Sequence, residues 1–185
     1  MPADNIDRAV KKGTGDLDGI TYEELTMEGY GPGGVAIIVE ILTDNKNRTA
    51  SDIRNIFSKK NGNIAGAGSV SWIFEKKGYM EVDKKVASED GLMTIVLDAG
   101  AQDMEVEEDI YTITTSTKDF ENVKKALLDN NIKTESAEIT MLPKSTVKLT
   151  GESAKQVLAL VDALEDSDDV QNVHANFDIP DEEII

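Results

Sequence analysis

The sequence contains no cysteine, and it contains a single histidine, His174. The absence of cysteine excludes disulfides, thiolate nucleophiles and cysteine-ligated zinc or iron–sulfur sites, and it suits a reducing compartment. A single histidine leaves no second imidazole for a histidine-pair metal site or for a proton relay. We therefore expect no metal site and no cofactor.

Long apolar runs are also missing. No stretch approaches the ~20 apolar residues that a membrane-spanning helix needs. The first residues, Met1 to Asn5, lack the basic segment and apolar run of a secretory signal. We therefore expect a soluble, cytoplasmic protein with no membrane partner. Its 185 residues fit one large domain or two to three small ones.

Acidic residues are abundant, with 36 Asp and Glu against 19 Lys and Arg, a formal net charge of −17. This sign opposes contact with phosphates, and the simplest interpretation is that it keeps the protein soluble and monomeric. The excess is uneven, because residues 1–60 carry 8 basic and 10 acidic side chains and residues 61–185 carry 11 and 26. A local basic patch on an acidic body is therefore compatible with the composition.

The spacing of apolar residues predicts an α+β protein. The predicted helices are 4–12, 48–60, 89–99, 120–129 and 152–165. The predicted strands are 22–28, 35–42, 70–74, 79–82, 110–115, 135–142, 147–149 and 173–179.

The order of these elements predicts how the chain divides into domains. Residues 21–83 and 145–185 are expected to form a discontinuous split βαβ, ferredoxin-like domain. Residues 84–144 are expected to form a second small α+β domain inserted into it. The helix within residues 1–20 has little to pack against, so we interpret it as the remnant of an N-terminal helical domain.

The loop Gly29–Gly34 matches the pattern G-x-G-x-x-G. A dinucleotide site needs a helix directly after the glycines, whereas an apolar strand follows here and Pro32 stiffens the loop. No Lys-Ser/Thr pair follows the last glycine, which also excludes a phosphate-binding P-loop. We therefore predict a tight strand-to-strand connection and no small-molecule substrate.

The segment Thr43–Thr49 is a dense polar run beside predicted core. Polar and basic side chains at a helix start suit contacts to phosphates or base edges. The alternative is ordinary helix capping by Asn47, and both roles can hold together. The candidate nucleic-acid-binding residues here are Asn45, Lys46, Asn47, Arg48 and Arg54.

Catalytic groups do not assemble into a recognisable pattern. The carboxylates of 103–109 and 165–169 are interpreted as solvated loops, and His174 as an exposed or half-buried strand residue without a nucleophile motif. We therefore predict that the chain is not an enzyme. The aromatic side chains Trp72, Phe74 and Phe177 alternate with polar residues, which favours core packing over a base-stacking platform.

Six segments resemble the YebC/PmpR family, in the same order and over essentially the whole chain. They are Asp4–Gly15, Glu28–Ala36, Thr43–Thr49, Gly62–Ile64, Gly68–Phe74 and Asn176–Pro180. The resemblance implies an N-terminal helical domain, a ferredoxin-like domain and a third domain inserted in the second. The chain departs from that pattern because the basic N-terminal domain, which opens with a His-Ser-Lys-Trp motif, is expected to be absent before Met1.

The resemblance implies a non-enzymatic regulator of gene expression. One role in the family is that of a transcriptional regulator that binds promoter DNA. The other is that of a translation factor that acts on the ribosome and relieves stalls. The resemblance implies no catalytic residues. Arg8, Lys11 and Lys12 lie near the position of the basic domain that is expected to be absent, and they join the candidate nucleic-acid-binding residues. A protein-binding regulatory module remains the alternative from a different class.

Overall fold

The computed structural model describes residues 20–184, so the predicted helix at 4–12 lies outside the described residues. The chain divides into two compact units: unit 1 comprises residues 1–74 and 143–185, and unit 2 comprises residues 75–142. Both are built from strands and helices, and the fold is α+β as predicted. No helix of residues 20–184 is long and apolar enough to cross a membrane.

Unit 1 contains a four-stranded sheet with the order β3-β1-β2-β9. Its strands are β1 (Glu23–Tyr30), β2 (Ala36–Thr43), β3 (Asn63–Ala65) and β9 (Val170–Ala175). Strands β2 and β3 both run antiparallel to β1, which lies between them, and α2 (Lys46–Lys59) connects them. The β2-α2-β3 segment is therefore a split βαβ unit.

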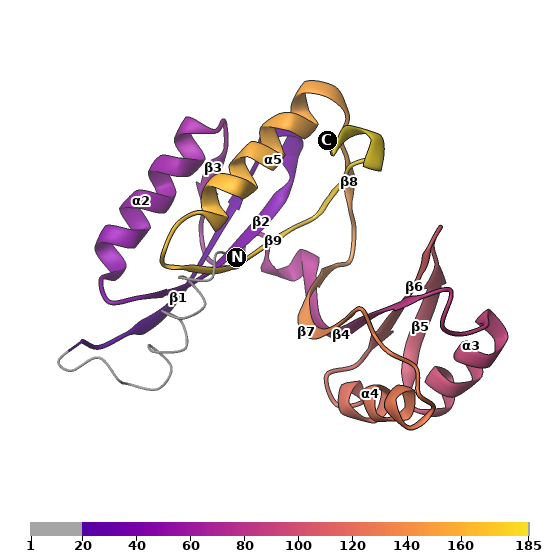
Figure 1. The fold of residues 1–185 in the computed structure, drawn as a ribbon. Coiled ribbons are helices and arrows are strands. Elements are labelled where there is room, and N and C mark those ends of the chain that lie inside the picture. Colours follow the sequence, from indigo (N-terminus) through magenta and orange to yellow (C-terminus); the bar gives the residue numbers. More distant parts are fainter. Residues whose placement is uncertain (1–19, 185) are drawn as a thin grey trace. The chain divides into compact units, whose positions relative to one another are not determined.

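Helices α2 and α5 (Gly151–Glu165) lie on the same side of this sheet (Figure 1). Side chains alternate along a strand, so Ile37, Val39 and Ile41 of β2 all point toward the helices. They meet Ile53 and Phe57 of α2, together with a stripe from α5. That stripe consists of Ala154, Val157, Leu160 and Leu164.

A tight loop connects the antiparallel strands β1 and β2, as predicted, but Gly29 and Tyr30 belong to β1, so the loop begins at Gly31. It contains the 3-10 turn η1 (Pro32–Gly34), where Gly33 has a φ of 76°. A Cβ on Gly33 would lie 2.5 Å from a methyl carbon of Leu149. The backbone conformation therefore favours glycine at this position, and a larger residue would also displace the Leu149 side chain.

The prediction of one strand over 173–179 is wrong. Strand β9 ends at Ala175, and β10 (Phe177–Asp178) pairs in parallel with β8 (Val147–Lys148) before the turn η3 (Asp181–Glu183). Asn176 is buried, where its Oδ1 accepts from the Ala36 N–H at 2.7 Å and its Nδ2 donates to the Ser145 carbonyl at 3.2 Å. The amide thus ties three segments of unit 1 together.

Unit 2 has its own four-stranded sheet, with the order β5-β6-β4-β7. Its elements are β4 (Phe74–Asp83), α3 (Glu89–Asp98), β5 (Ala101–Val106), β6 (Ile110–Thr115), α4 (Phe120–Asp129) and β7 (Ser136–Pro143). Figure 1 shows α3 and α4 on the same side of the sheet. Their side chains share one core with Met80 and Val82 of β4 and Ile113 of β6.

The unit boundaries differ from those predicted at residues 83/84 and 144/145. Strand β4 pairs with β6, with Gly78 opposite Thr115 and Asp83 opposite Ile110, so it belongs to unit 2. The strand predicted over 70–74 is also wrong, because Ser71–Ile73 forms the 3-10 turn η2 and β4 begins at Phe74. Alternation of apolar residues predicts a strand but does not specify its pairing partner.

Local signals at helix ends agree with the structure. The hydroxyl of Ser88 accepts from the Gly91 N–H at 3.3 Å and caps α3, which agrees with the predicted helix start at residue 89. Asn61 and Asn131 adopt positive φ values of 61° and 58° just beyond α2 and α4, the left-handed conformation that ends a helix.

Candidate nucleic-acid interface

Helix α2 begins two residues earlier than predicted, and Asn45 rather than Asn47 is its N-cap. The Asn45 Oδ1 accepts from the Arg48 N–H at 3.1 Å. Asn47 is exposed in the first turn. The polar run therefore forms a capped helix start, with Asn45 in the capping role that was predicted for Asn47.

A hydrogen-bonded network surrounds the start of α2. The hydroxyls of Thr43 and Thr49 lie 2.7 Å apart, and Thr49 donates to Asp169 Oδ2 at 2.9 Å. Arg48 Nη2 donates to Asp44 at 2.9 Å and to the same Asp169 oxygen at 3.2 Å. The hydrogen bonds to Asp44 and then to Asp169 raise the pKa of Arg48 above its ordinary value.

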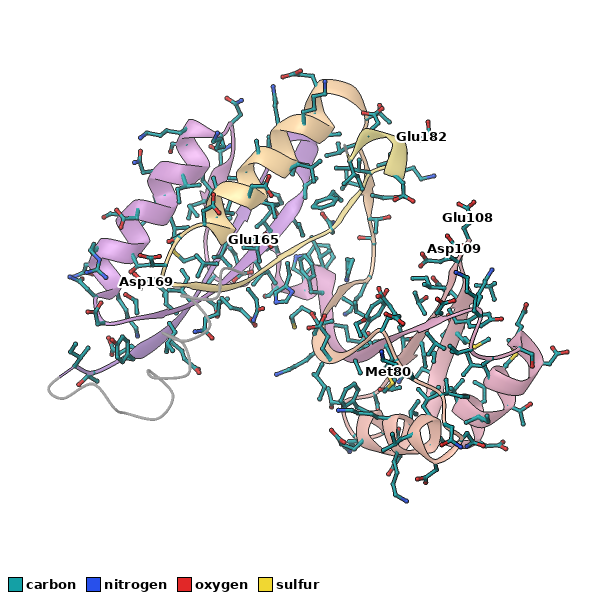
Figure 2. The ribbon with its side chains drawn as sticks, in the orientation of Figure 1. Met80, Glu108, Asp109, Glu165, Asp169 and Glu182 are labelled. Atoms are coloured by element: carbon teal, nitrogen blue, oxygen red, sulfur yellow. The ribbon has the colours of Figure 1, made fainter. Side chains whose placement is uncertain are left out.

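Asp169 reaches this network from the segment between α5 and β9, as Figure 2 shows. Two carboxylates therefore compensate the charge of Arg48. Lys46 is also near an acid, with its Nζ 3.8 Å from Glu23. Nearby carboxylates thus offset the charges of Lys46 and Arg48, two of the three basic candidate residues on α2.

Arg54 is placed differently. Its side chain is exposed and makes no ion pair with another residue of the range 20–184. It lines a groove of about 290 Å³ together with Met27, Ile64, Gly66 and Ala67. Lys59 at the end of α2 and the adjoining Lys60 are also exposed. Arg8, Lys11 and Lys12 lie outside the described residues.

Among the helices of residues 20–184, α2 alone has an excess of basic side chains. It carries four basic residues and one acidic residue. Helix α3 carries none and three, α4 two and two, and α5 one and three. The exposed face of α2 is therefore the helical surface best suited to phosphates.

The loop 66–73 follows this groove in the chain and is held by a buried carboxylate. Glu28, which is 6% exposed, accepts hydrogen bonds from the backbone N–H groups of Gly68, Val70 and Ser71 at 2.6, 3.0 and 2.7 Å. Burial alone would raise the pKa of Glu28, but these three donors hold it below its ordinary value. The ionised carboxylate therefore fixes the loop.

The prediction that Trp72 packs in the core is wrong, because its side chain is 68% exposed. Its indole Nε1–H donates to the Ser69 carbonyl at 2.9 Å, and the Tyr30 hydroxyl donates to the same oxygen at 3.4 Å. Phe74 is buried and Phe177 is half-buried, as core packing requires. The turn η2 breaks the strand alternation on which the expectation for Trp72 depended.

His174 is half-buried on β9, with its Nε2 3.3 Å from Glu40 on the neighbouring strand. Other acidic side chains labelled in Figure 2, namely Glu108, Asp109, Glu165 and Glu182, are exposed. No cluster of three or more His, Asp or Glu within 20–184 could hold a metal ion. The features that gather near one another in unit 1 are instead Arg54, the groove and the loop 66–73.

Comparison with known proteins identifies the family. The family described as "TACO1/YebC second and third domain" matches residues 22–177. A relative from Syntrophobacter fumaroxidans is 56% identical over 183 residues, and one from Endomicrobium trichonymphae is 53% identical over 186 residues. Both are named "Probable transcriptional regulatory protein", and the alignments cover 98% and 100% of this chain and 74% of each relative.

A solved structure agrees with the sequence comparison. The conserved hypothetical protein Aq1575 from Aquifex aeolicus is 46% identical, with a TM-score of 0.78 over 98% of this chain and 75% of Aq1575. The resemblance noted in the sequence is thus confirmed over most of its length. The chain belongs to the TACO1/YebC family, a family of regulatory proteins.

Proposed function

We propose that this protein is a non-enzymatic, cytoplasmic regulator of gene expression that binds nucleic acid through unit 1. The observation that carries the proposal is the basic excess of α2 in a chain whose net charge is −17. A cationic surface on an acidic body attracts phosphates locally while the rest of the molecule repels them. The contact surface consists of Arg54, Lys59 and Lys60, with smaller contributions from Asn45, Lys46, Asn47 and Arg48.

RNA, as exposed on the ribosome, is the target that the geometry of α2 favours. A helix that reads the DNA major groove inserts its N-terminal residues toward the base edges. At that end of α2, Asp44 and Asp169 accompany Arg48, and Glu23 lies near Lys46. The buried residues Thr49, Ile53 and Phe57 also commit one face of the helix to the core. Carboxylates at the leading end oppose entry into a duplex groove.

Promoter DNA is the second candidate target. It is favoured by the name "Probable transcriptional regulatory protein" that relatives more than half identical to this chain carry. Duplex DNA would use the same cations through phosphate contacts, so the two targets cannot be separated by charge reversal alone.

Competition between the two targets tests the proposal. Labelled 185-residue protein is sedimented with purified ribosomes while unlabelled promoter-length duplex is added, across a series of salt concentrations. The variant Arg54→Glu is compared with Lys155→Glu, an exposed lysine on α5 of the same unit that undergoes the same change of charge.

We expect ribosome binding that survives excess duplex and weakens with Arg54→Glu, but not with Lys155→Glu. The loss of one phosphate contact should also reduce the slope of log affinity against log salt by about one. Duplex that displaces the protein in a sequence-dependent way would make promoter DNA the target. Equal effects of Arg54→Glu and Lys155→Glu would contradict the proposal that the α2 surface contacts nucleic acid. Binding to neither ribosomes nor duplex would favour a protein that regulates through another protein.

A further inference from the structure

The loop 66–73 displays an aromatic side chain that no part of the core requires. Trp72 is 68% exposed although its only polar atom, Nε1, already donates to the Ser69 carbonyl. The ring therefore gains no hydrogen bond to water by lying at the surface, and a large apolar area stays solvated. Tyr30, 38% exposed, donates to the same carbonyl, so two exposed rings are anchored at one point.

The loop that carries Trp72 is held by hydrogen bonds and by burial. The carboxylate of Glu28 binds the backbone of the loop at Gly68, Val70 and Ser71, and Val70 is fully buried. A side chain fixed before a ligand arrives loses little conformational entropy on binding. The rings of Tyr30 and Trp72 are thus preorganised for a flat partner.

The charge around Trp72 is unusual for this chain. The longest stretches without an Asp or Glu are 53–74, with 22 residues, and 139–151, with 13 residues, although the chain has 36 acidic residues. These two stretches meet beside Trp72, where the Lys144 N–H donates to the Ile73 carbonyl at 2.7 Å. Two exposed cations therefore lie near the ends of the loop. Arg54 lines the groove with Gly66 and Ala67, and Lys144 is hydrogen-bonded through its backbone to Ile73.

Building on the proposed function, we propose that Trp72, with Tyr30, stacks on an unpaired nucleobase of a single-stranded nucleic acid whose phosphates face Arg54 and Lys144. Aromatic side chains beside cations are the combination that single-strand binding uses. A protein partner would instead need a wider apolar patch. The other exposed residues of the loop are small, namely Gly66, Ala67, Gly68 and Ser71, while the apolar Val70 is buried and Ile73 is half-buried.

Trp72 is the only tryptophan in the chain, so its fluorescence reports on this site directly. The 185-residue protein is titrated with an oligouridylate of about 12 nucleotides, with the matching oligothymidylate and with an RNA duplex of the same length. We expect saturable quenching by the single strands and little by the duplex. Equal response to both single strands means that the base alone is recognised, whereas preference for RNA means that the sugar contributes.

Variants separate stacking from structure. By anisotropy of labelled oligouridylate, Trp72→Ala should bind roughly tenfold to a hundredfold more weakly. Trp72→Phe should retain most of the affinity, since it keeps a flat ring. Leu128→Ala in unit 2 removes another exposed apolar side chain, 74% exposed, and should bind like the unaltered chain. Thermal melts followed by circular dichroism check that all three variants fold.

Unchanged affinity of Trp72→Ala, or equal quenching by duplex, would overturn the stacking site. A fluorescence change that depends on protein concentration without nucleic acid would assign the rings to a second copy of this chain instead. Ribosome binding that depends on Arg54 but not on Trp72 would leave the proposed function standing and remove this inference. Quenching by single strands without any ribosome binding would support the stacking site and contradict ribosome binding as the proposed function.

Discussion

The two units have the same build and the same charge, yet they distribute that charge differently. Each has a four-stranded sheet and two helices that share one core. The described part of unit 1 carries 8 basic and 16 acidic side chains, and unit 2 carries the same numbers. No acid-free stretch of unit 2 exceeds 9 residues. In unit 1, five of the eight basic residues lie in the acid-free ranges 53–74 and 143–151.

The comparison teaches that net charge does not locate a contact surface in this protein. Both units should repel a polyanion at long range, because each has twice as many acidic as basic groups. At contact distance the Debye length of about 8 Å makes local composition decisive. The described parts of the two units have the same net charge, but in unit 1 most basic residues lie apart from acidic ones in the sequence. This separation is why we propose unit 1 as the nucleic-acid-binding unit.

The largest expected effect is on the stability of unit 1. Asn176→Leu removes the acceptor of the buried Ala36 N–H and the donor to the carbonyl of Ser145, which lies in an exposed segment. We expect the free energy of unfolding to fall by about 2–4 kcal/mol. Urea unfolding followed by Trp72 fluorescence measures the change in unit 1.

The control for that variant is Asn172→Ala, which removes an exposed hydrogen bond to Glu40 and should change stability by less than about 0.5 kcal/mol. A small effect of Asn176→Leu would mean that the buried amide is not what joins β9, β2 and the segment before β8.

The next effect concerns the loop that distinguishes unit 1. Glu28→Gln should lower the free energy of unfolding by about 1.5–3 kcal/mol at neutral pH, because a charged acceptor of three N–H groups is lost. The fold lowers the pKa of Glu28, so its contribution is complete above the ordinary value of 4.5 and disappears as pH falls through the lower folded value. Unfolding of both proteins at several pH values should therefore show the difference shrinking below pH 4.5. A constant difference would contradict this account of Glu28.

A smaller effect compares two arginines on α2. Arg54→Ala should weaken ribosome binding about threefold to tenfold, since its charge is not compensated by a neighbour among residues 20–184. Arg48→Ala should weaken it less, because Asp44 and Asp169 already offset that charge. Co-sedimentation at fixed salt measures both. The opposite order would show that Arg48 leaves its carboxylates to contact the ligand.

The smallest effect lies in unit 2. Lys125 is 77% exposed and pairs with Asp129 one turn along α4, at 3.4 Å. Lys125→Gln should change the free energy of unfolding by less than about 0.5 kcal/mol and leave nucleic-acid binding unaltered. Chemical denaturation and the binding titration check the two statements. A loss of binding here would remove the contrast between the units.

Local chemistry made much of the fold predictable from the sequence. Apolar residues over 35–42 predicted β2, and helical spacing over 152–165 predicted α5, because both patterns depend on neighbouring residues alone. Pairing partners are a long-range property, which is why β4 was assigned to the wrong domain.

The candidate site was harder to predict for the same reason. The acids that compensate Arg48 and Lys46 include Asp169 and Glu23, which are 121 and 23 residues away in the sequence. The sequence predicts Trp72 in the core because a short alternation of apolar and polar residues indicates a strand. The structure has the turn η2 there, held by a hydrogen bond from the Ser71 N–H to Glu28, and this long-range bond cannot be predicted from local sequence. The absence of acidic residues over 53–74 was the available signal.

The most direct test of the central claim compares matched charge reversals in the two units. One protein carries Arg54→Glu, Lys59→Glu and Lys60→Glu in unit 1. The other carries Lys118→Glu, Lys124→Glu and Lys125→Glu in unit 2, and all six side chains are exposed. The two proteins have the same net charge, so ribosome co-sedimentation in one buffer isolates position. We predict that the unit 1 protein loses ribosome binding and that the unit 2 protein retains most of it. Equal losses would show that net charge governs binding and would contradict the account.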